Sequence, residues 1–379
     1  MDNEVAICYR CDTQILSQNS SYEHIILNAC GGKLKSKTLL CKKCNSDFGN
    51  SFDNILAVQV NELANMLMIK RERGEPQPIE GKTANGTAYK IFANGDLMKA
   101  DPTVQVQREG NQVRLSINAA NDEQYRQILK GIKRKNPGFD ADEAFKVAER
   151  SNYYLNEPIN IQMNMGGPDV FRSIIKTAIN YFIHLGGKSA DIKHLLPFLE
   201  KKVDLENVWY HYPDQYIYHP KIDEVSHILK IVGDPEQKLL FAYVELFNAH
   251  NYIVLLNQNY TGKAINSLYA YDLINNQEFQ PVVQLDYSRN YVLDLFLNKD
   301  AHPHLKITER LNRTFKIANE RQVKFHLNKL ISSAVHDVLG AYPKGTVFTN
   351  ELITKMQQEV RLRVMPFIEH QRYKKKINR

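Results

Sequence analysis

Four cysteines near the start of the sequence have the spacing of metal ligands. All five cysteines lie within the first 44 residues, and four of them form the Cys-x-x-Cys pairs Cys8/Cys11 and Cys41/Cys44. A disulfide scaffold would spread its cysteines through a secreted chain, whereas two such pairs suit one tetrahedral zinc ion held by four thiolates. We therefore predict a structural zinc site at these four residues. The fifth, Cys30, is interpreted as a small buried apolar side chain.

Side chains suited to phosphodiester hydrolysis lie between these pairs and directly after them. Glu23 and His24 are adjacent, and Asn45 follows the last cysteine. Carboxylate and amide oxygens are hard ligands that suit Mg²⁺ or Mn²⁺, and a neutral imidazole beside them can take a proton from water. If zinc pins the two ends of a small hairpin against a helix that starts near Asn45, the three side chains come together although His24 and Asn45 are 21 positions apart.

The fragment CYRC…EHIILNACGGKLKSKTLLCKKCNSDFG resembles the HNH endonucleases of the ββα-metal (His-Me finger) type, in particular those with a structural zinc held by two Cys-x-x-Cys pairs. The resemblance covers about residues 6–52. By motif position it implies that Glu23 is the first ligand of a catalytic divalent ion, that His24 is the general base, and that Asn45 is the second ligand of that ion. The zinc ligands that it implies are Cys8, Cys11, Cys41 and Cys44.

Two positions depart from the pattern of this family. The middle position of the motif, commonly an Asn five residues before the third cysteine, is Ser36, and the usual Pro after the Glu-His-Ile-Ile run is Leu27. A hydroxyl offers fewer hydrogen bonds than a carboxamide. The motif therefore does not identify what braces the loop that carries His24.

The resemblance implies hydrolysis of DNA, expected to be double-stranded, with Mg²⁺ or Mn²⁺ as the catalytic cofactor and Zn²⁺ as the structural one. Restriction, phage defence and mobile-element homing are all compatible with this activity. Two alternatives stay open. One is a non-catalytic zinc-ribbon protein that binds nucleic acid or regulates, in which Glu23 and His24 are vestigial. The other is a nuclease that cuts RNA or single strands.

Local patterns predict the elements that must position these residues. Apolar residues recur at helical spacing after the second pair of cysteines, so we predict one helix from Asn45 to about Ile69. The segment 71–86 is charged and rich in Pro and Gly, which predicts a linker. Strand patterns follow at about 89–117 and 207–297, and helical patterns at about 122–134, 140–150, 168–185, 189–202 and 305–379.

These patterns predict an α+β protein in four parts. The parts are an HNH nuclease module at 1–70, the linker at 71–86, an α+β recognition or regulatory region at 87–304, and a helical, basic segment at 305–379. No motif within 87–379 identifies what that region does. A sensor, a sequence reader and a dimerisation platform are all open, and the last would make the protein a homodimer.

Composition is that of an ordinary globular protein. Of the 379 residues, 43% are hydrophobic and 24% are charged, so a sizeable core can form. No apolar run approaches the roughly 20 residues that span a bilayer, and the start of the chain is acidic where a signal peptide would be basic. We therefore expect a cytoplasmic protein with no membrane partner. The net charge of +7 does not by itself indicate a nucleic-acid partner.

Overall fold

The computed structural model describes residues 6–109, 112–119, 121–149, 154–299 and 303–377. They form two compact units, each made of two separate stretches of chain: 1–77 with 163–320, and 78–162 with 321–379. The predicted α+β class is confirmed. The part boundaries at 70, 86 and 304 stay a prediction. Each predicted part is one continuous stretch of chain, whereas each compact unit contains two separate stretches.

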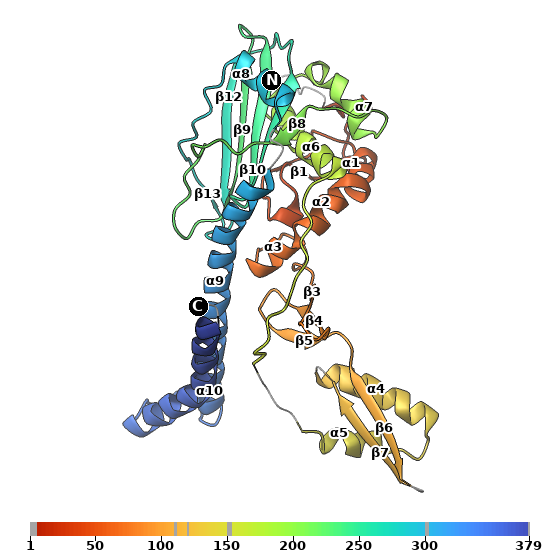
Figure 1. The fold of residues 1–379 in the computed structure, drawn as a ribbon, viewed down its shortest axis with the longest axis vertical. Coiled ribbons are helices and arrows are strands. Elements are labelled where there is room, and N and C mark those ends of the chain that lie inside the picture. The colour runs from red at the N-terminus through yellow and green to blue at the C-terminus, as the bar shows by residue number, and fades with distance from the viewer. Residues whose placement is uncertain (1–5, 110–111, 120, 150–153, 300–302, 378–379) are drawn as a thin grey trace. The chain divides into compact units, whose positions relative to one another are not determined.

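A six-stranded antiparallel sheet is the centre of the first unit (Figure 1). Its strand order is β13-β12-β9-β10-β11-β8. The strands are β8 (Val208–Tyr210), β9 (Ser226–Asp234), β10 (Leu239–Leu246), β11 (His250–Asn257), β12 (Ile265–Asp272) and β13 (Gln277–Glu278).

The central strands are buried on both faces. In β10, Leu240, Ala242 and Val244 face one apolar core, while Phe241 and Tyr243 face a second. This alternation follows from the two-residue repeat of a strand. The second core is closed by α8 (Arg289–Leu297), a helix within the range that we predicted as strands.

Helix α6 (Pro168–His184) packs on the first face of the sheet and on the N-terminal module (Figure 1). It occupies the predicted 168–185 range, and twelve of its residues are buried. After it, the predicted helix at 189–202 is a series of short turns: η3 (Ser189–Asp191), η4 (Lys193–Leu195) and α7 (Leu196–Leu199). Helix α6 is therefore the element that joins the module to the sheet.

The N-terminal module is a small hairpin followed by short helices. Its elements are β1 (Glu23–His24), η1 (Asn28–Cys30), β2 (Lys35–Ser36), α1 (Lys42–Phe48), the π-helical turn η2 (Gly49–Asp53), α2 (Asn54–Gln59) and α3 (Asn61–Met66). The predicted helix does begin at the second pair of cysteines, at Lys42. The prediction of one continuous helix was wrong, because non-helical dihedral angles at Ser51 interrupt it.

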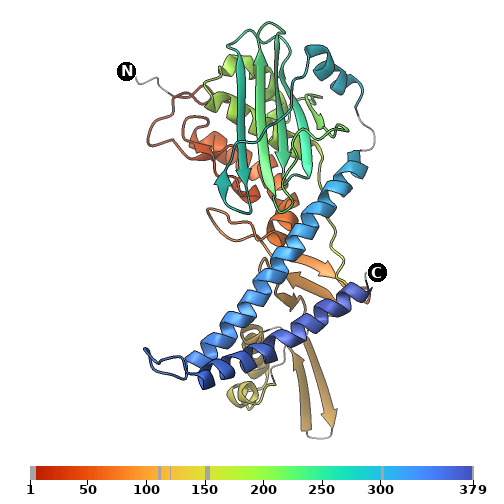
Figure 2. The same cartoon turned by 90° about the vertical axis from the view of Figure 1, so that its left-hand side faces the viewer.

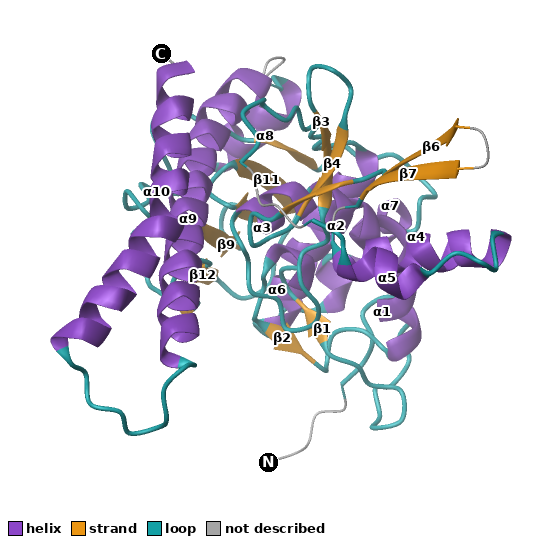
Figure 3. Ribbon diagram, turned by 90° about the horizontal axis from the view of Figure 1, so that it is seen from below, coloured by secondary structure: helices purple, strands orange, loops and turns teal. Residues whose placement is uncertain are grey.

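The second unit contains small sheets and helices. Its strands are β3 (Ile79–Lys82), β4 (Ala88–Ile91) and β5 (Leu97–Lys99) in one sheet, and β6 (Thr103–Glu109) and β7 (Gln112–Asn118) in another, with α4 (Asp122–Lys135) and α5 (Ala141–Lys146) after them (Figure 3). Strand β3 lies within the segment predicted as a linker.

Two long helices complete the chain, as predicted for 305–379 (Figure 2). Helix α9 (Pro303–Leu339) begins in the first unit and ends in the second, and α10 (Asn350–Ile377) follows a loop. Arg363 of α10 donates to Asp337 of α9 and to Glu359, so this arginine is already paired within the protein. No helix in the described part of the chain has both the length and the apolar character needed to cross a membrane.

A buried histidine of the sheet holds the loop that follows β1. In its neutral form, His227 donates from Nε2 to the Cys30 carbonyl at 2.9 Å and accepts at Nδ1 from the Phe247 amide at 3.2 Å. Both ring nitrogens are used, so protonation would break the bond from Phe247. Burial lowers the pKa of His227 to about 4.

We expect the protein to lose stability as pH falls from 6.5 toward 4. In the unfolded chain His227 is protonated near pH 6.5, whereas in the folded chain it is protonated only near pH 4. This difference lowers the free energy of unfolding by roughly 3 kcal/mol at pH 4. Melting temperatures measured across this range should fall less steeply for His227→Gln than for the natural chain. In the control His184→Gln, which alters an exposed histidine, the slope should not change. Equal slopes for both variants would contradict the assignment.

Candidate active site

The four predicted zinc ligands lie together. The Sγ atoms of Cys8, Cys11, Cys41 and Cys44 are all within 4.8 Å of one another, and those of Cys11 and Cys41 are 3.8 Å apart. A regular tetrahedron with Zn–S bonds of about 2.3 Å has edges of about 3.8 Å. The thiols therefore form a cluster that can hold a zinc ion, and the cluster joins the two ends of the β1–β2 segment.

The hairpin β1–β2 separates Glu23 from His24. The two strands pair antiparallel, with Glu23 opposite Ser36 and His24 opposite Lys35 (Figure 3). Because successive side chains of a strand point to opposite faces, Glu23 turns inward and His24 outward. Their exposure agrees: the Glu23 side chain is 4% exposed and that of His24 is 21% exposed.

Glu23 meets α6 in the interior. The Lys176 ammonium donates to Glu23 Oε1, and the Asn180 amide donates to the same oxygen at 2.8 Å. Tyr9 donates to the Asn180 amide oxygen at 2.8 Å and so fixes which way that amide points. One oxygen of Glu23 is thus held by two donors from a helix far along the chain.

A second buried carboxylate shares the lysine. Lys176 also donates to Asp53 Oδ2 at 2.5 Å, and Ser173 donates to Asp53 Oδ1. Burial alone lowers the pKa of Lys176, but the two carboxylates outweigh that effect and raise it above its ordinary value. Lys176 therefore stays protonated and is shared by two buried carboxyl groups, while burial raises the pKa of the Glu23 carboxyl above its ordinary value.

Two oxygens remain available for a cation. No described residue donates a hydrogen bond to Glu23 Oε2 or to Asn45 Oδ1. The side chain of Asn45 bonds through its amide nitrogen instead, which donates to Ser21 Oγ at 3.0 Å and to the Tyr22 carbonyl at 3.1 Å. Glu23, His24 and Asn45 line one cavity of about 260 Å³. Mg²⁺ commonly takes one or two protein oxygens and keeps several waters, so this donor set fits it.

His24 is paired with a carboxylate that the motif does not include. Its Nε2 lies 3.2 Å from Glu72 Oε2, in the loop after α3. Lys35 donates to both oxygens of Glu72 and lowers the pKa of that carboxyl, so it is ionised and can only accept. Nε2 must then carry the hydrogen, and Nδ1 holds the free electron pair. Burial lowers the pKa of His24, which favours the neutral ring at pH 7.

Ser36 does not brace His24. Its hydroxyl bonds to the Thr38 hydroxyl at 2.8 Å and accepts from the Thr38 amide at 3.1 Å. Glu72 contacts the imidazole instead, and Asn28 holds Glu72 in place by accepting from its amide at 2.8 Å. The residue that contacts His24 is therefore Glu72, which lies outside the motif, and not Ser36 at its middle position.

The glycine pair after β1 is required by the turn. Gly31 has φ +88°, a left-handed conformation that side chains rarely adopt. A Cβ on Gly32 would lie 1.9 Å from the Ile26 carbonyl oxygen. These two residues let the chain return from β1 to β2 against the buried Ile26.

Comparison with known proteins gives one family match, and it covers the N-terminal module. Residues 8–61 match the family model of the HNH endonucleases. The N-terminal module is an HNH domain. The chain matches no curated protein and no solved structure. At the level of the family, the HNH domain is that of a nuclease-type hydrolase, and it implies a nucleic-acid substrate.

The HNH domain depends on residues that sequence reasoning missed. Spacing gave no sign of Glu72, which lies in the predicted linker. Helix α6 did carry a signal, because Arg172, Lys176 and Asn180 are polar residues four apart in an otherwise apolar helical run. All three are buried. Polar side chains at helical spacing inside an apolar helix indicate buried partners on another element.

We expect Cys41→Ser to lose bound metal and to melt at a lower temperature, because a structural zinc site contributes directly to folding. Elemental analysis of the purified protein should find about one zinc per chain before the substitution and much less after it. The matched control is Cys30→Ala, a buried cysteine outside the cluster, which should keep the metal. Full zinc content in Cys41→Ser would contradict the assignment.

We expect Lys176→Met to destabilise the protein by about 3–5 kcal/mol, because it leaves two buried carboxylates without their cation. The control Lys193→Met removes an ion pair with Asp12 whose side chains are 49% and 59% exposed, and surface pairs contribute only about 0–1 kcal/mol. Urea denaturation measures both. A similar loss in the two variants would show that the buried cluster does not stabilise the HNH domain.

Proposed function

We propose that this chain is a metal-dependent endonuclease that hydrolyses DNA phosphodiester bonds, with His24 as the general base and one Mg²⁺ or Mn²⁺ ion held by Glu23 and Asn45. The observation that carries the proposal is that Glu23, His24 and Asn45 line one cavity, while Glu23 Oε2 and Asn45 Oδ1 receive no hydrogen bond from a described residue. We further propose that the four cysteines hold a structural Zn²⁺.

His24 is prepared for its task by its neighbours. The Glu72 carboxylate accepts from Nε2–H, which leaves Nδ1 as the atom that takes a proton from water. When Nδ1 gains that proton, the ring becomes a cation beside the Glu72 carboxylate, which stabilises it. Glu72 thus fixes the tautomer and favours the charged state that proton transfer creates.

Glu23 and Asn45 are held rigidly for metal binding. Each side chain uses its other polar atom on the protein, Glu23 through Lys176 and Asn180, and Asn45 through Ser21 and the Tyr22 carbonyl. The bound divalent ion supplies charge neutralisation at the phosphate and at the leaving oxygen. Because both side chains are already held by these bonds, little side-chain entropy would be lost when they bind the ion.

We take double-stranded DNA as the substrate and the cytoplasm as the location. A module of this size contacts few base pairs, so the larger remainder of the chain would supply targeting, as a sequence reader, a sensor or a dimerisation platform. The zinc-ribbon alternative, in which Glu23 and His24 are vestigial, offers no reason for an imidazole that Glu72 orients in the lining of the same cavity as Glu23 and Asn45.

We expect the purified chain with Mg²⁺ or Mn²⁺ to nick or linearise supercoiled plasmid. His24→Ala should lower the rate by at least roughly 10²- to 10⁴-fold, as expected for loss of a general base, and EDTA should abolish cleavage. The control His184→Ala alters an exposed histidine of α6 and should cleave normally.

Cleavage by His24→Ala at the rate of the natural chain would rule out the assigned base. Absence of cleavage in every sample, with zinc still bound and with duplex DNA, single strands and RNA each offered, would favour the zinc-ribbon alternative.

A further inference from the structure

The outward face of the β1–β2 hairpin carries more than His24. The sequence Lys33-Leu34-Lys35-Ser36-Lys37 places lysines at alternate positions, so they share one face of the hairpin. The register sets Lys35 opposite His24 and, continued by one residue, brings Lys37 opposite Tyr22. The face with the general base therefore also carries an aromatic ring and ammonium groups.

Two of these lysines crowd one tyrosine. The Lys37 ammonium lies 4.5 Å from the centre of the Tyr22 ring, and that of Lys35 lies 4.8 Å from it. Tyr22 is 53% exposed and is part of the cavity lining together with His24. We call Tyr22, Lys35 and Lys37 the lysine face.

Folding alone does not explain this arrangement. An exposed aromatic ring contributes little to a core, and two like charges at one ring repel each other. Lys35 is partly neutralised by Glu72, but among the described residues Lys37 has no acidic partner. A half-exposed aromatic ring with two ammonium groups close to it, in the lining of the cavity that also includes His24, fits a strand with regular negative charges and planar groups.

We propose that the lysine face binds the DNA strand directly beside the phosphate that is cut, with Lys37 and Lys35 on backbone phosphates and the Tyr22 ring against the sugar and base between them. This inference rests on the proposed function, because it places the substrate on the same face as His24. It assigns substrate affinity to Lys37 and Tyr22, whose side chains have no part in the chemical step, whereas Lys35 also holds Glu72.

The first experiment measures binding without cleavage. Anisotropy of a fluorescein-labelled DNA duplex is titrated with the full chain in EDTA at several salt concentrations. Lys37→Ala should weaken binding and reduce the slope of log K against log salt by about 0.9, since one phosphate contact is lost. Tyr22→Ala should weaken binding about 5-fold or more, and Tyr22→Phe should not. The Asn45 bond to Tyr22 uses the backbone carbonyl, so these variants keep it.

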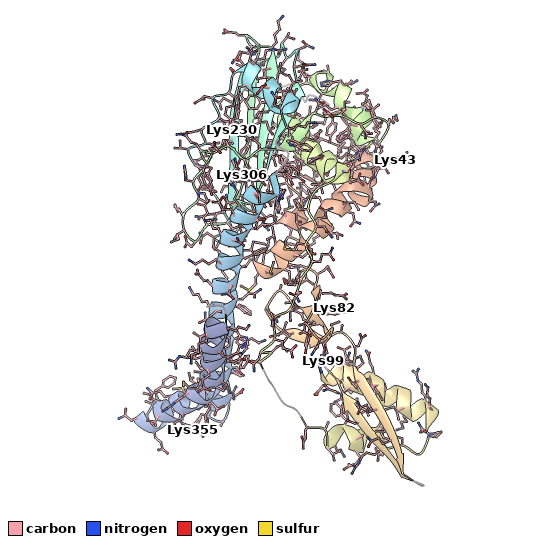
Figure 4. All side chains as sticks on the ribbon, viewed as in Figure 1. Lys43, Lys82, Lys99, Lys230, Lys306 and Lys355 are labelled. Atoms are coloured by element: carbon pink, nitrogen blue, oxygen red, sulfur yellow. The ribbon has the colours of Figure 1, made fainter. Side chains whose placement is uncertain are left out.

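The matched control is Lys43→Ala, which removes the same charge from α1 beside the cysteine cluster (Figure 4). If Lys43→Ala weakens binding and changes the salt slope as much as Lys37→Ala does, the lysine face is not a specific contact and the inference is wrong. A labelled single strand of the same sequence, titrated in parallel, shows whether the face needs a duplex. Tighter binding of the single strand would overturn the assignment to duplex DNA.

The second experiment separates this inference from the proposed function. In plasmid cleavage with Mg²⁺, Lys37→Ala and Tyr22→Ala should raise KM several-fold and leave kcat nearly unchanged, whereas His24→Ala lowers kcat. If the natural chain binds DNA through Lys37 but cleaves nothing, the nuclease proposal fails and the binding face stands. If the natural chain cleaves and both variants keep its KM, the nuclease proposal stands and the binding face fails.

Discussion

A buried lysine between two carboxylates is the constraint on which the rest of the HNH domain depends. Lys176 is 2% exposed and contacts Glu23 and Asp53, which come from two different elements of the N-terminal module. Each of these charges alone would be very unfavourable in the interior, and they are tolerated only together and only in this geometry. The module and helix α6 must therefore fold against each other.

This dependence makes the sheet part of the structure that holds Glu23 in place. Helix α6 packs on the sheet with one side and supplies Ser173, Lys176 and Asn180 with another. The sheet also reaches the module directly, through the bond of His227 to the Cys30 carbonyl. Residues 163–320 are thus part of the scaffold that orients Glu23, and they form one compact unit with the HNH domain.

The two faces of the β1–β2 hairpin have different surroundings. The inward residue, Glu23, is fixed by buried donors, while the outward residues lie where a substrate can reach them. Glu72 belongs to the outward side, where it holds the imidazole of His24 through Nε2 and is itself held by Lys35. This carboxylate contacts the imidazole, whereas the hydroxyl of Ser36 bonds to Thr38.

The sequence by itself determined the parts whose signal is local. Two Cys-x-x-Cys pairs with Glu23, His24 and Asn45 at motif spacing predicted the HNH domain, and the thiols do cluster. Helical patterns in the sequence likewise predicted α6 and the long C-terminal helices. The break of the helix after Cys41 was missed, although Gly49, a residue that favours helix ends, lies two positions before Ser51, where the dihedral angles are not helical.

Only the tertiary structure decided which distant residues complete the site. Lys176 is 153 positions from Glu23, and Glu72 is 48 positions from His24. No spacing rule connects such pairs, because their contact depends on how α6 and the loop after α3 pack rather than on the period of any one element. The role of a single charged residue, such as Lys176 in an apolar helix or Glu72 in a charged loop, can be assigned only once the fold shows which group lies next to it.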